Sequence, residues 1–271
     1  MSNSTHTRRY VSVRGVERLR ERLSDRDLAI IRQVADLRLM SARQIQAIHF
    51  PAEQHTNELA ATRARQRVVT RLCRAQLLCA LQRRVGGIRA GSAGLVLALG
   101  PVGQRVLGLS GPRQRGHEPG LRFFDHTLAV AQLIVGVQLA SRQGRCELLD
   151  VQAEPGCWRD FASSGGRRWL RPDAFLAIDS RGYELRWFVE LDRSSESIST
   201  VLKKCRLYVA YYQSGKEQIA HGVFPRVAWV VPDDVRAERV RKAIDRDRQL
   251  PDRLFVVTTS EKAVTALCSI N

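Results

Sequence analysis

The sequence predicts an α+β protein of two domains, the second of them built on a mixed α/β sheet. Apolar residues recur with helical spacing in three stretches before residue 81, and a glycine-rich stretch of alternating apolar residues follows them. In the second half, helical stretches alternate with short strand-like runs, an order typical of a mixed sheet flanked by helices. The domains are therefore expected at 24–109 and 121–271, after a basic arm at 1–23.

The segment SGPRQRGHEPG, residues 110–120, combines glycine, proline and charge, which indicates a linker between the two domains. In the first domain, Ser24 or Asp25 can cap the first helix because both side chains accept a hydrogen bond from a free backbone N–H. The predicted helices are, in chain order, about 24–40, 42–49 and 58–81. The stretch VGGIRAGSAGLVLALG after them suits a β-hairpin.

Three helices and then a hairpin are the order of a winged helix-turn-helix, in which the third helix enters the major groove and the hairpin contacts the DNA backbone. Arginines are dense on both elements. The candidates for DNA contact are Arg63, Arg65, Arg67, Arg71 and Arg74 on the third helix, and Arg83, Arg84 and Arg89 on the hairpin. The alternative is that these arginines form a solvated helix face, or that the helix pairs with a second copy of the chain.

The charge balance predicts a polyanionic partner. The chain carries a net charge of +17 with a pI near 10.7. Residues 1–120 hold 21 Lys and Arg against 8 Asp and Glu, whereas residues 121–271 hold 23 against 19. The basic excess therefore belongs to the first half, and double-stranded DNA is the expected ligand of that half.

Carboxylates gather in the second half, in the run RPDAFLAI-DSRG-YELRWFVELD. Two extended runs flank the turn residues 179–182. If these four residues close a hairpin, Asp173 lies opposite Phe188 and diagonal to Glu190, about 7–8 Å away, and Asp192 extends the acidic row. The pattern predicts either a divalent-metal site or a solvated sheet face.

Pro-Asp, a hairpin, Glu-x-Asp and a following helix resemble the core of the PD-(D/E)xK nuclease superfamily. The resemblance implies that Asp173 and Glu190 hold Mg²⁺, with Asp173, Glu190 and Asp192 as the candidate catalytic residues. Asp192 stands where that superfamily has a lysine, which indicates degenerate catalysis. Lys203 or Lys204 on the next helix could replace the lysine, but surface charge is the preferred interpretation of both.

Several classes of function are excluded by missing motifs. The sequence has no GxxxxGK[ST] phosphate loop, GxGxxG turn, HExxH helix or GxSxG elbow, so ATP hydrolysis, redox cofactors and serine hydrolysis are not expected. Relaxase activity would need clustered histidines beside a tyrosine, and the histidines are scattered; His126 is expected to be a packing residue. The six cysteines form no CxxC pair, and no apolar run reaches about 18 residues, which favours a cytoplasmic protein with no membrane span.

Three stretches together resemble the replication-relaxation family of plasmid and mobile-element proteins: RDLAIIRQVADLRLMSARQIQAIHF, FFDHTLAVAQLIVGVQLA and RPDAFLAI…WFVELDRSSES…KKCRLYVAYY. The resemblance covers roughly residues 24–260 and implies a DNA-binding accessory role in replication, relaxation or mobilisation. A relaxase or replication initiator is the implied protein partner, and homodimerisation is an open possibility. Two alternatives remain: a Mg²⁺-dependent endonuclease, and a winged-helix repressor that dimerises through its second domain.

Overall fold

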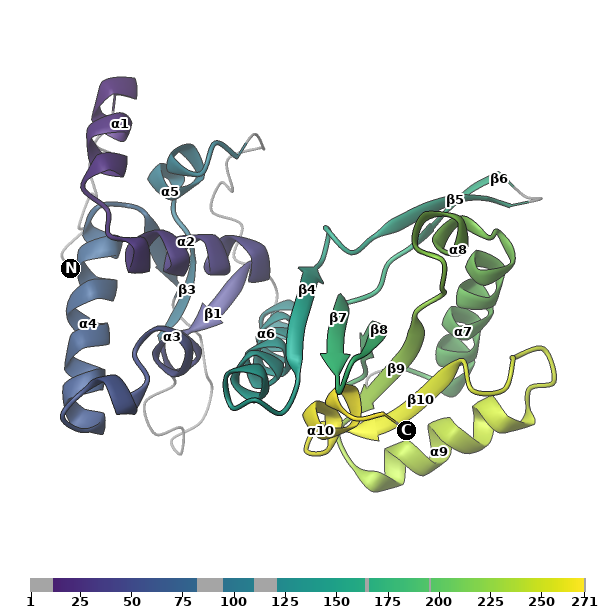
Figure 1. Ribbon diagram of the computed structural model, residues 1–271. Coiled ribbons are helices and arrows are strands. Elements are labelled where there is room, and N and C mark those ends of the chain that lie inside the picture. Colours follow the sequence, from purple (N-terminus) through teal and green to yellow (C-terminus); the bar gives the residue numbers. More distant parts are fainter. Residues whose placement is uncertain (1–11, 82–94, 110–120, 164–165, 195, 271) are drawn as a thin grey trace, which may run out of the picture. The chain divides into compact units, whose positions relative to one another are not determined.

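The computed structural model describes residues 12–81, 95–109, 121–163, 166–194 and 196–270. The chain forms two compact units, Met1–Gly120 and Leu121–Asn271. Both units combine helices with sheet (Figure 1), so the α+β class predicted from the sequence is confirmed. The predicted linker, 110–120, and residues 1–11 of the predicted basic arm lie outside the described residues, while the rest of that arm contains a helix, Val13–Glu21.

The first unit packs helices against a small antiparallel sheet whose strand order is β1-β3-β2. Its elements are α1 (Val13–Glu21), α2 (Asp25–Leu37), β1 (Leu39–Ser41), α3 (Ala42–His49), the 3-10 turn η1 (Ala52–Gln54), α4 (Glu58–Arg74), β2 (Leu78–Leu81), β3 (Val96–Leu99) and α5 (Pro101–Val106). The three core helices are α2, α3 and α4. Their buried faces carry Ile31, Ile45 and Leu72, each 0 % exposed, so one apolar core holds the unit together.

Capping boxes fix where two of these helices begin. The side chain of Ser24 accepts a hydrogen bond from the backbone of Asp27 and that of Asp27 accepts one from Ser24, and Ser41 and Gln44 repeat the arrangement at α3. Each box pairs two backbone N–H groups that have no partner inside the helix. The predicted start of the first helix and the predicted span of the second are confirmed.

The predicted end of the third helix was wrong. Helix α4 stops at Arg74, and Leu78–Leu81 forms strand β2 instead of a further helical turn. Gln76 between them has a positive φ of 56°, which reverses the chain direction. In the same way, α2 ends at Leu37 because Arg38 has a φ of 65°, and the next three residues form β1, which the sequence did not predict.

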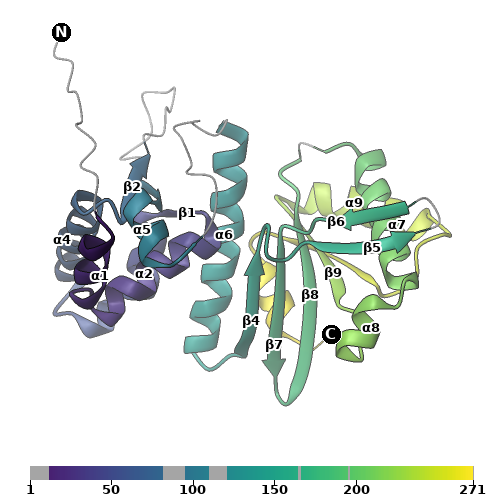
Figure 2. The same ribbon diagram turned by 90° about the horizontal axis from the view of Figure 1, so that it is seen from above.

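The second unit is a five-stranded mixed sheet with helices on both faces (Figures 1 and 2). Its elements are α6 (Leu121–Arg142), β4 (Glu147–Ala153), β5 (Arg159–Ser163), β6 (Gly166–Leu170), β7 (Ala174–Ser180), β8 (Tyr183–Leu191), α7 (Ile198–Gln213), α8 (Lys216–His221), β9 (Arg226–Val231), α9 (Asp234–Arg246), β10 (Phe255–Thr259) and α10 (Ala263–Cys268). The strand order is β10-β9-β8-β7-β4. Strands β8, β9 and β10 run parallel, while β7 is antiparallel to both of its neighbours.

The two faces of β8 show how the layers are separated. Trp187 donates a hydrogen bond from Nε1 to the carbonyl of Leu267 in α10, 3.2 Å away. Phe188, the next residue, packs on the opposite face against the ring of Tyr208 in α7. This alternation is the period-2 pattern read from the sequence, and it directs Glu190 towards α7 as well.

The turn between β7 and β8 corrects the predicted register. The hairpin closes with two residues, Arg181 and Gly182, rather than with the four residues 179–182. Both have positive φ, 55° and 84°, the conformation of tight hairpin turns. Phe175 therefore pairs with Phe188, a shift of two residues from the predicted register.

One further segment of this unit differs from expectation. Residues 155–170, predicted as a basic loop, include the antiparallel hairpin of β5 and β6. Helix α6 is apolar enough over Phe123–Arg142, with a mean hydropathy of 1.4, to span a membrane by length and composition alone. Half of that stretch is buried, and α6 packs on α10, where a Cβ at Gly136 would lie 2.7 Å from Cγ2 of Val264. This packing explains the apolar composition.

Candidate functional site

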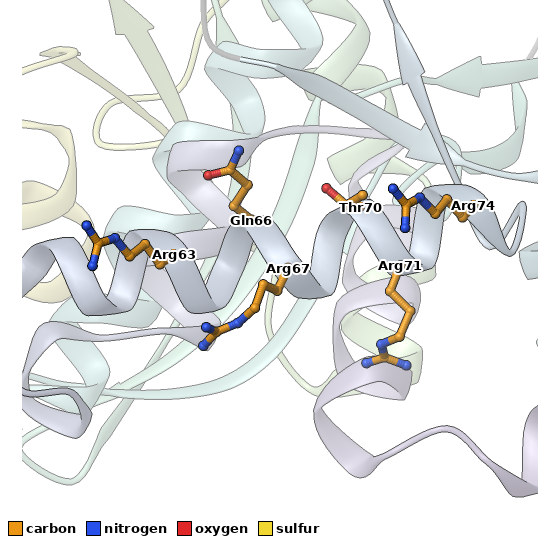
Figure 3. A pocket seen from close by; sticks show the side chains of 6 residues that line it. All are labelled: Arg63, Gln66, Arg67, Thr70, Arg71 and Arg74. Atoms are coloured by element: carbon orange, nitrogen blue, oxygen red, sulfur yellow. The ribbon is translucent and has the colours of Figure 1, made fainter.

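The first candidate site is an exposed basic face of α4 (Figure 3). Six side chains at helical spacing line a shallow concavity of about 610 Å³: Arg63, Gln66, Arg67, Thr70, Arg71 and Arg74. We call this surface the α4 face. All six residues are solvent-exposed. Four guanidinium groups and two neutral hydrogen-bonding side chains on one helix stripe are suited to a polyanion.

One of the four arginines on the α4 face already has a structural partner. Nη2 of Arg71 lies 2.7 Å from Oδ1 of Asp27, whose side chain is only 2 % exposed. Burial raises the pKa of Asp27, but hydrogen bonds from Arg71 and Ser24 outweigh it and leave that pKa below its ordinary value. Arg71 thus ties α4 to the capping box of α2, and it positions the helix as well as adding charge.

The remaining three arginines of the α4 face, Arg63, Arg67 and Arg74, make no ion pair with any residue that the structure describes. Arg65 lies away from this face. It is half-buried, and its Nε has no hydrogen-bond partner within the described residues. The structure therefore gathers Arg63, Arg67, Arg71 and Arg74 but separates Arg65 from them. The other three predicted DNA contacts lie outside the described residues: Arg83, Arg84 and Arg89.

The second candidate site is the carboxylate cluster at the end of β8. The backbone N–H of Asp173 donates to the carbonyl of Val189, 3.0 Å away, so the β7–β8 register continues to this residue. The backbone N–H of Leu191 in turn donates to Oδ2 of Asp173 at 2.7 Å. In the observed register Asp173 lies directly opposite Glu190, whereas the predicted register placed the two residues diagonal to each other.

Glu190 is 2 % exposed, and both of its carboxylate oxygens accept hydrogen bonds. The hydroxyl of Tyr208 donates to Oε1 at 2.8 Å, and Nζ of Lys204 donates to Oε2 at 3.0 Å. Nζ of Lys204 also lies 2.8 Å from Oε1 of Glu196. Burial and the nearby charge of Asp173 raise the pKa of Glu190 above the ordinary range, although Lys204 and Tyr208 lower it.

The position of Lys204 contradicts the preferred interpretation from sequence. It was read as surface charge, but its side chain is only 35 % exposed and is bonded to the buried Glu190. Lys203, one residue earlier, is exposed as expected. The signal that could have found Lys204 is its spacing: it lies three residues after Val201 and four before Tyr208, both of them buried.

Asp173 is bonded to a histidine that the sequence assigned to packing. Nε2 of His126 lies 3.0 Å from Oδ1 of Asp173, with the ring as donor. This hydrogen bond raises the pKa of His126 against the burial of the ring, which lowers it. His126 comes from the first turns of α6, so the cluster joins helices from both faces of the sheet.

Asp192 does not join Asp173 and Glu190. Its side chain, 0 % exposed, accepts a hydrogen bond at Oδ2 from Nε of Arg236 in α9 at 2.7 Å, and Nη2 of Arg236 lies 2.6 Å from the same oxygen in an ion pair. Arg236 also donates to the backbone carbonyl of Glu196. The three carboxylates therefore do not form the predicted row. Asp173 and Glu190 lie together, whereas Asp192 belongs to a separate buried ion pair with Arg236. The mixed charge of α9 gave no sign of which arginine would do this.

The arrangement as it stands fits a metal ion poorly. Both oxygens of Glu190 and both of Asp173 accept hydrogen bonds from protein donors. Within the described part of the chain, no three side chains of His, Cys, Asp or Glu gather closely enough to hold a metal. A lysine ammonium occupies the position beside Glu190 where a cation would bind, so Lys204 and a metal would compete for Oε2.

The chain matches the replication-relaxation family over residues 31–227. No curated protein and no solved structure matched it. The family match covers well over half of the chain and includes both α4 and the carboxylate cluster. The protein therefore belongs to the replication-relaxation family, a membership that indicates a role in the replication or relaxation of a plasmid or mobile element.

Proposed function

We propose that this protein binds double-stranded DNA through the α4 face, as an accessory factor in plasmid or mobile-element replication or relaxation. Three core helices and a small antiparallel sheet with the strand order β1-β3-β2 are features of a winged helix-turn-helix. In that fold the third helix, here α4, is the one that enters the major groove. The observation that carries the proposal is that Arg63, Arg67 and Arg74 stand exposed there without a carboxylate partner among the described residues.

The charge of the first half agrees with this assignment. Each phosphate contact releases counterions, so the logarithm of the binding constant falls with the logarithm of salt concentration by about 0.9 per contact. Three arginines of the α4 face would account for roughly 2.7 of that slope. Gln66 and Thr70 on the same face can donate and accept hydrogen bonds, which allows contact with base edges as well as phosphates.

The test removes Arg63, Arg67 and Arg74 together by substitution with Ala and measures binding to duplex DNA across a salt series. The expected result is weaker binding with a slope smaller by about two to three. The matched control removes the same charge from exposed arginines of the second unit: Arg239→Ala, Arg246→Ala and Arg248→Ala. Equal effects of the two triple variants would show that only net charge matters and would remove α4 from the interface.

The second unit is proposed to be a nuclease-like scaffold with impaired chemistry, which serves a protein partner such as a relaxase or replication initiator. The order α6, β4, β7, β8, α7, β9 and the opposition of Asp173 and Glu190 support the PD-(D/E)xK comparison. The engagement of both carboxylates by protein donors supports the loss of catalysis.

A second candidate function, a Mg²⁺-dependent endonuclease, is favoured by one observation. Lys204 brings an ammonium group within 3.0 Å of Glu190, although the sequence has Asp192 at the usual lysine position. A lysine beside the paired carboxylates could stabilise charge that develops at a phosphate. Incubation of supercoiled plasmid with Mg²⁺ or Mn²⁺ separates the two functions. Intact plasmid supports the scaffold, whereas nicking that Glu190→Gln abolishes would establish the endonuclease.

A further inference from the structure

We propose that the outer face of the β5–β6 hairpin is a second nucleic-acid surface, which stacks on unpaired bases of single-stranded DNA. This surface lies in the second unit and is separate from both the α4 face and the carboxylate cluster. It is defined by Ala162, Arg167, Trp169 and Arg171, with Asp160 between them. Figure 2 shows β5 and β6 as a two-stranded ribbon beside α7, separate from the five-stranded sheet.

The hairpin has an inner and an outer face because side chains alternate along each strand. Phe161 and Leu170 point inwards and are 3 % and 1 % exposed, and the ring of Phe161 packs 5.2 Å from that of Tyr211 in α7. The register pairs Asp160 with Trp169, which places both on the opposite, outer face. The inner face thus anchors the hairpin to the core and leaves the outer face to solvent.

The outer face displays an aromatic ring that the fold does not use. Trp169 is 45 % exposed, while Trp187 and Trp229 are each 1 % exposed in the core. The guanidinium of Arg167 lies 5.4 Å from the ring centre of Trp169, and that of Arg171 lies 4.8 Å from the ring centre of Trp158. Tryptophan is enriched at interfaces, because its ring supplies a large apolar contact area and its N–H can still be hydrated or hydrogen-bonded.

The charge around Trp169 identifies the ligand as an anion. Arg167 and Arg171 are exposed, and Lys216 of α8 reaches the hairpin from the side to donate to Asp160. Asp160 is the one carboxylate among the described residues of β5 and β6, and it is neutralised by its bonds to Arg167 and Lys216. A positive surface around a partly exposed aromatic ring combines backbone attraction with base stacking.

Single-stranded rather than duplex DNA fits this geometry best. Unpaired bases offer a π-face to an exposed ring, whereas bases in a duplex are already stacked on each other. Asp160 offsets one of the two charges of Arg167 and Lys216, so a net positive charge stays beside the ring of Trp169, where a phosphate of the same strand can reach it. Arg171 lies two residues before Asp173, so a strand held on this face would approach the carboxylate cluster.

The experiment measures binding of a fluorescein-labelled oligothymidine and of a duplex of equal length to the full chain and its variants. Trp169→Ala should weaken single-strand binding roughly 5- to 150-fold, the range of one lost stacking contact, and leave duplex binding unchanged. Trp169→Phe should retain most of the affinity because the ring is kept. Tyr183→Ala is the matched control, since Tyr183 is an exposed aromatic, 66 % accessible, at the β7–β8 turn of the same unit.

Tryptophan fluorescence gives an independent readout that does not depend on affinity. Oligothymidine should quench the emission of the wild-type chain and should quench the Trp169→Phe variant less, because Trp187 and Trp229 are buried and Trp158 is only partly exposed, with Arg171 over its ring. The α4 triple variant should keep this quenching, so failure of the α4 proposal and failure of this one are distinguishable. Unchanged single-strand binding in Trp169→Ala, or an equal loss for duplex, would overturn the proposal.

Discussion

Replacement of Lys204 by Met tests whether the ammonium compensates the buried Glu190. Glu190 is 3 % exposed in its side chain and keeps only the Tyr208 hydroxyl as donor once Lys204 is lost. Loss of one partner of a buried ion pair costs about 3–5 kcal/mol. Because Lys204 is itself 35 % exposed, solvent screening reduces the expected loss to about 2–3 kcal/mol.

The loss of folding stability in Lys204→Met should depend on pH, and the pKa of Glu190 decides whether the loss is larger at high or at low pH. Burial and the charge of Asp173 raise this pKa, so the stability contributed by Glu190 is present below its unfolded pKa and is lost as pH rises through the folded value. Without Lys204 the folded pKa rises further. The variant should therefore be close to wild type at about pH 5, where Glu190 takes up a proton, and weakest at about pH 8.

Urea unfolding of the full chain at both pH values measures this difference, followed by fluorescence of Trp229 and Trp187 in the core of the second unit. Lys203→Met is the control, since Lys203 is exposed on the same helix turn. Addition of Glu190→Gln to Lys204→Met should recover most of the stability at about pH 8. A loss that is equal at both pH values, or no larger than that of Lys203→Met, would refute the reasoning.

Three further predictions concern the same unit. NMR titration of His126 should give a pKa above the ordinary value, because the hydrogen bond to Asp173 raises it, and this pKa should fall back in Asp173→Asn. The stability that protonated His126 contributes to the fold is present below about pH 6.5, the unfolded pKa, and is lost as the pH rises through the folded pKa. Arg236→Met should cost about 3–5 kcal/mol in urea unfolding because it leaves Asp192 buried and unpaired, and Asp192→Asn in the same chain should recover part of it. Gly136→Ala should lower thermal stability by about 1–3 kcal/mol, because its methyl group would meet α10 at 2.7 Å.

Much of the fold was predictable because local rules decide it. The capping residues Ser24 and Ser41 fix helix starts, and the alternation of Trp187 and Phe188 fixes the two faces of a strand. The ends of helices were less predictable. Gln76 and Arg38 adopt positive φ although neither is glycine, so the residue types at these positions did not predict the turns that precede β2 and β1.

Only part of the carboxylate cluster could be predicted from the sequence, because the rest depends on contacts between elements that lie far apart along the chain. Strand alternation placed Asp173 and Glu190 on one face, but the predicted register left them diagonal, and only the two-residue turn sets them opposite each other. Spacing along α7 can show that Lys204 faces the core, but which carboxylate Lys204, His126 or Arg236 reaches depends on how α7, α6 and α9 lie on the sheet. The same limit applies to the α4 face, where helical periodicity could have separated Arg65 from its neighbours.

The two-residue turn at Arg181 and Gly182 governs chemistry at the far end of its hairpin. Because every residue of β7 is matched to β8 by counting outward from this turn, one inserted residue would move each partner along by a step and turn its side chain to the other side. Asp173 and Glu190 would then be parted without either being altered. Insertions or deletions in the turn between β7 and β8 could therefore create or abolish the function of the paired carboxylates in related proteins.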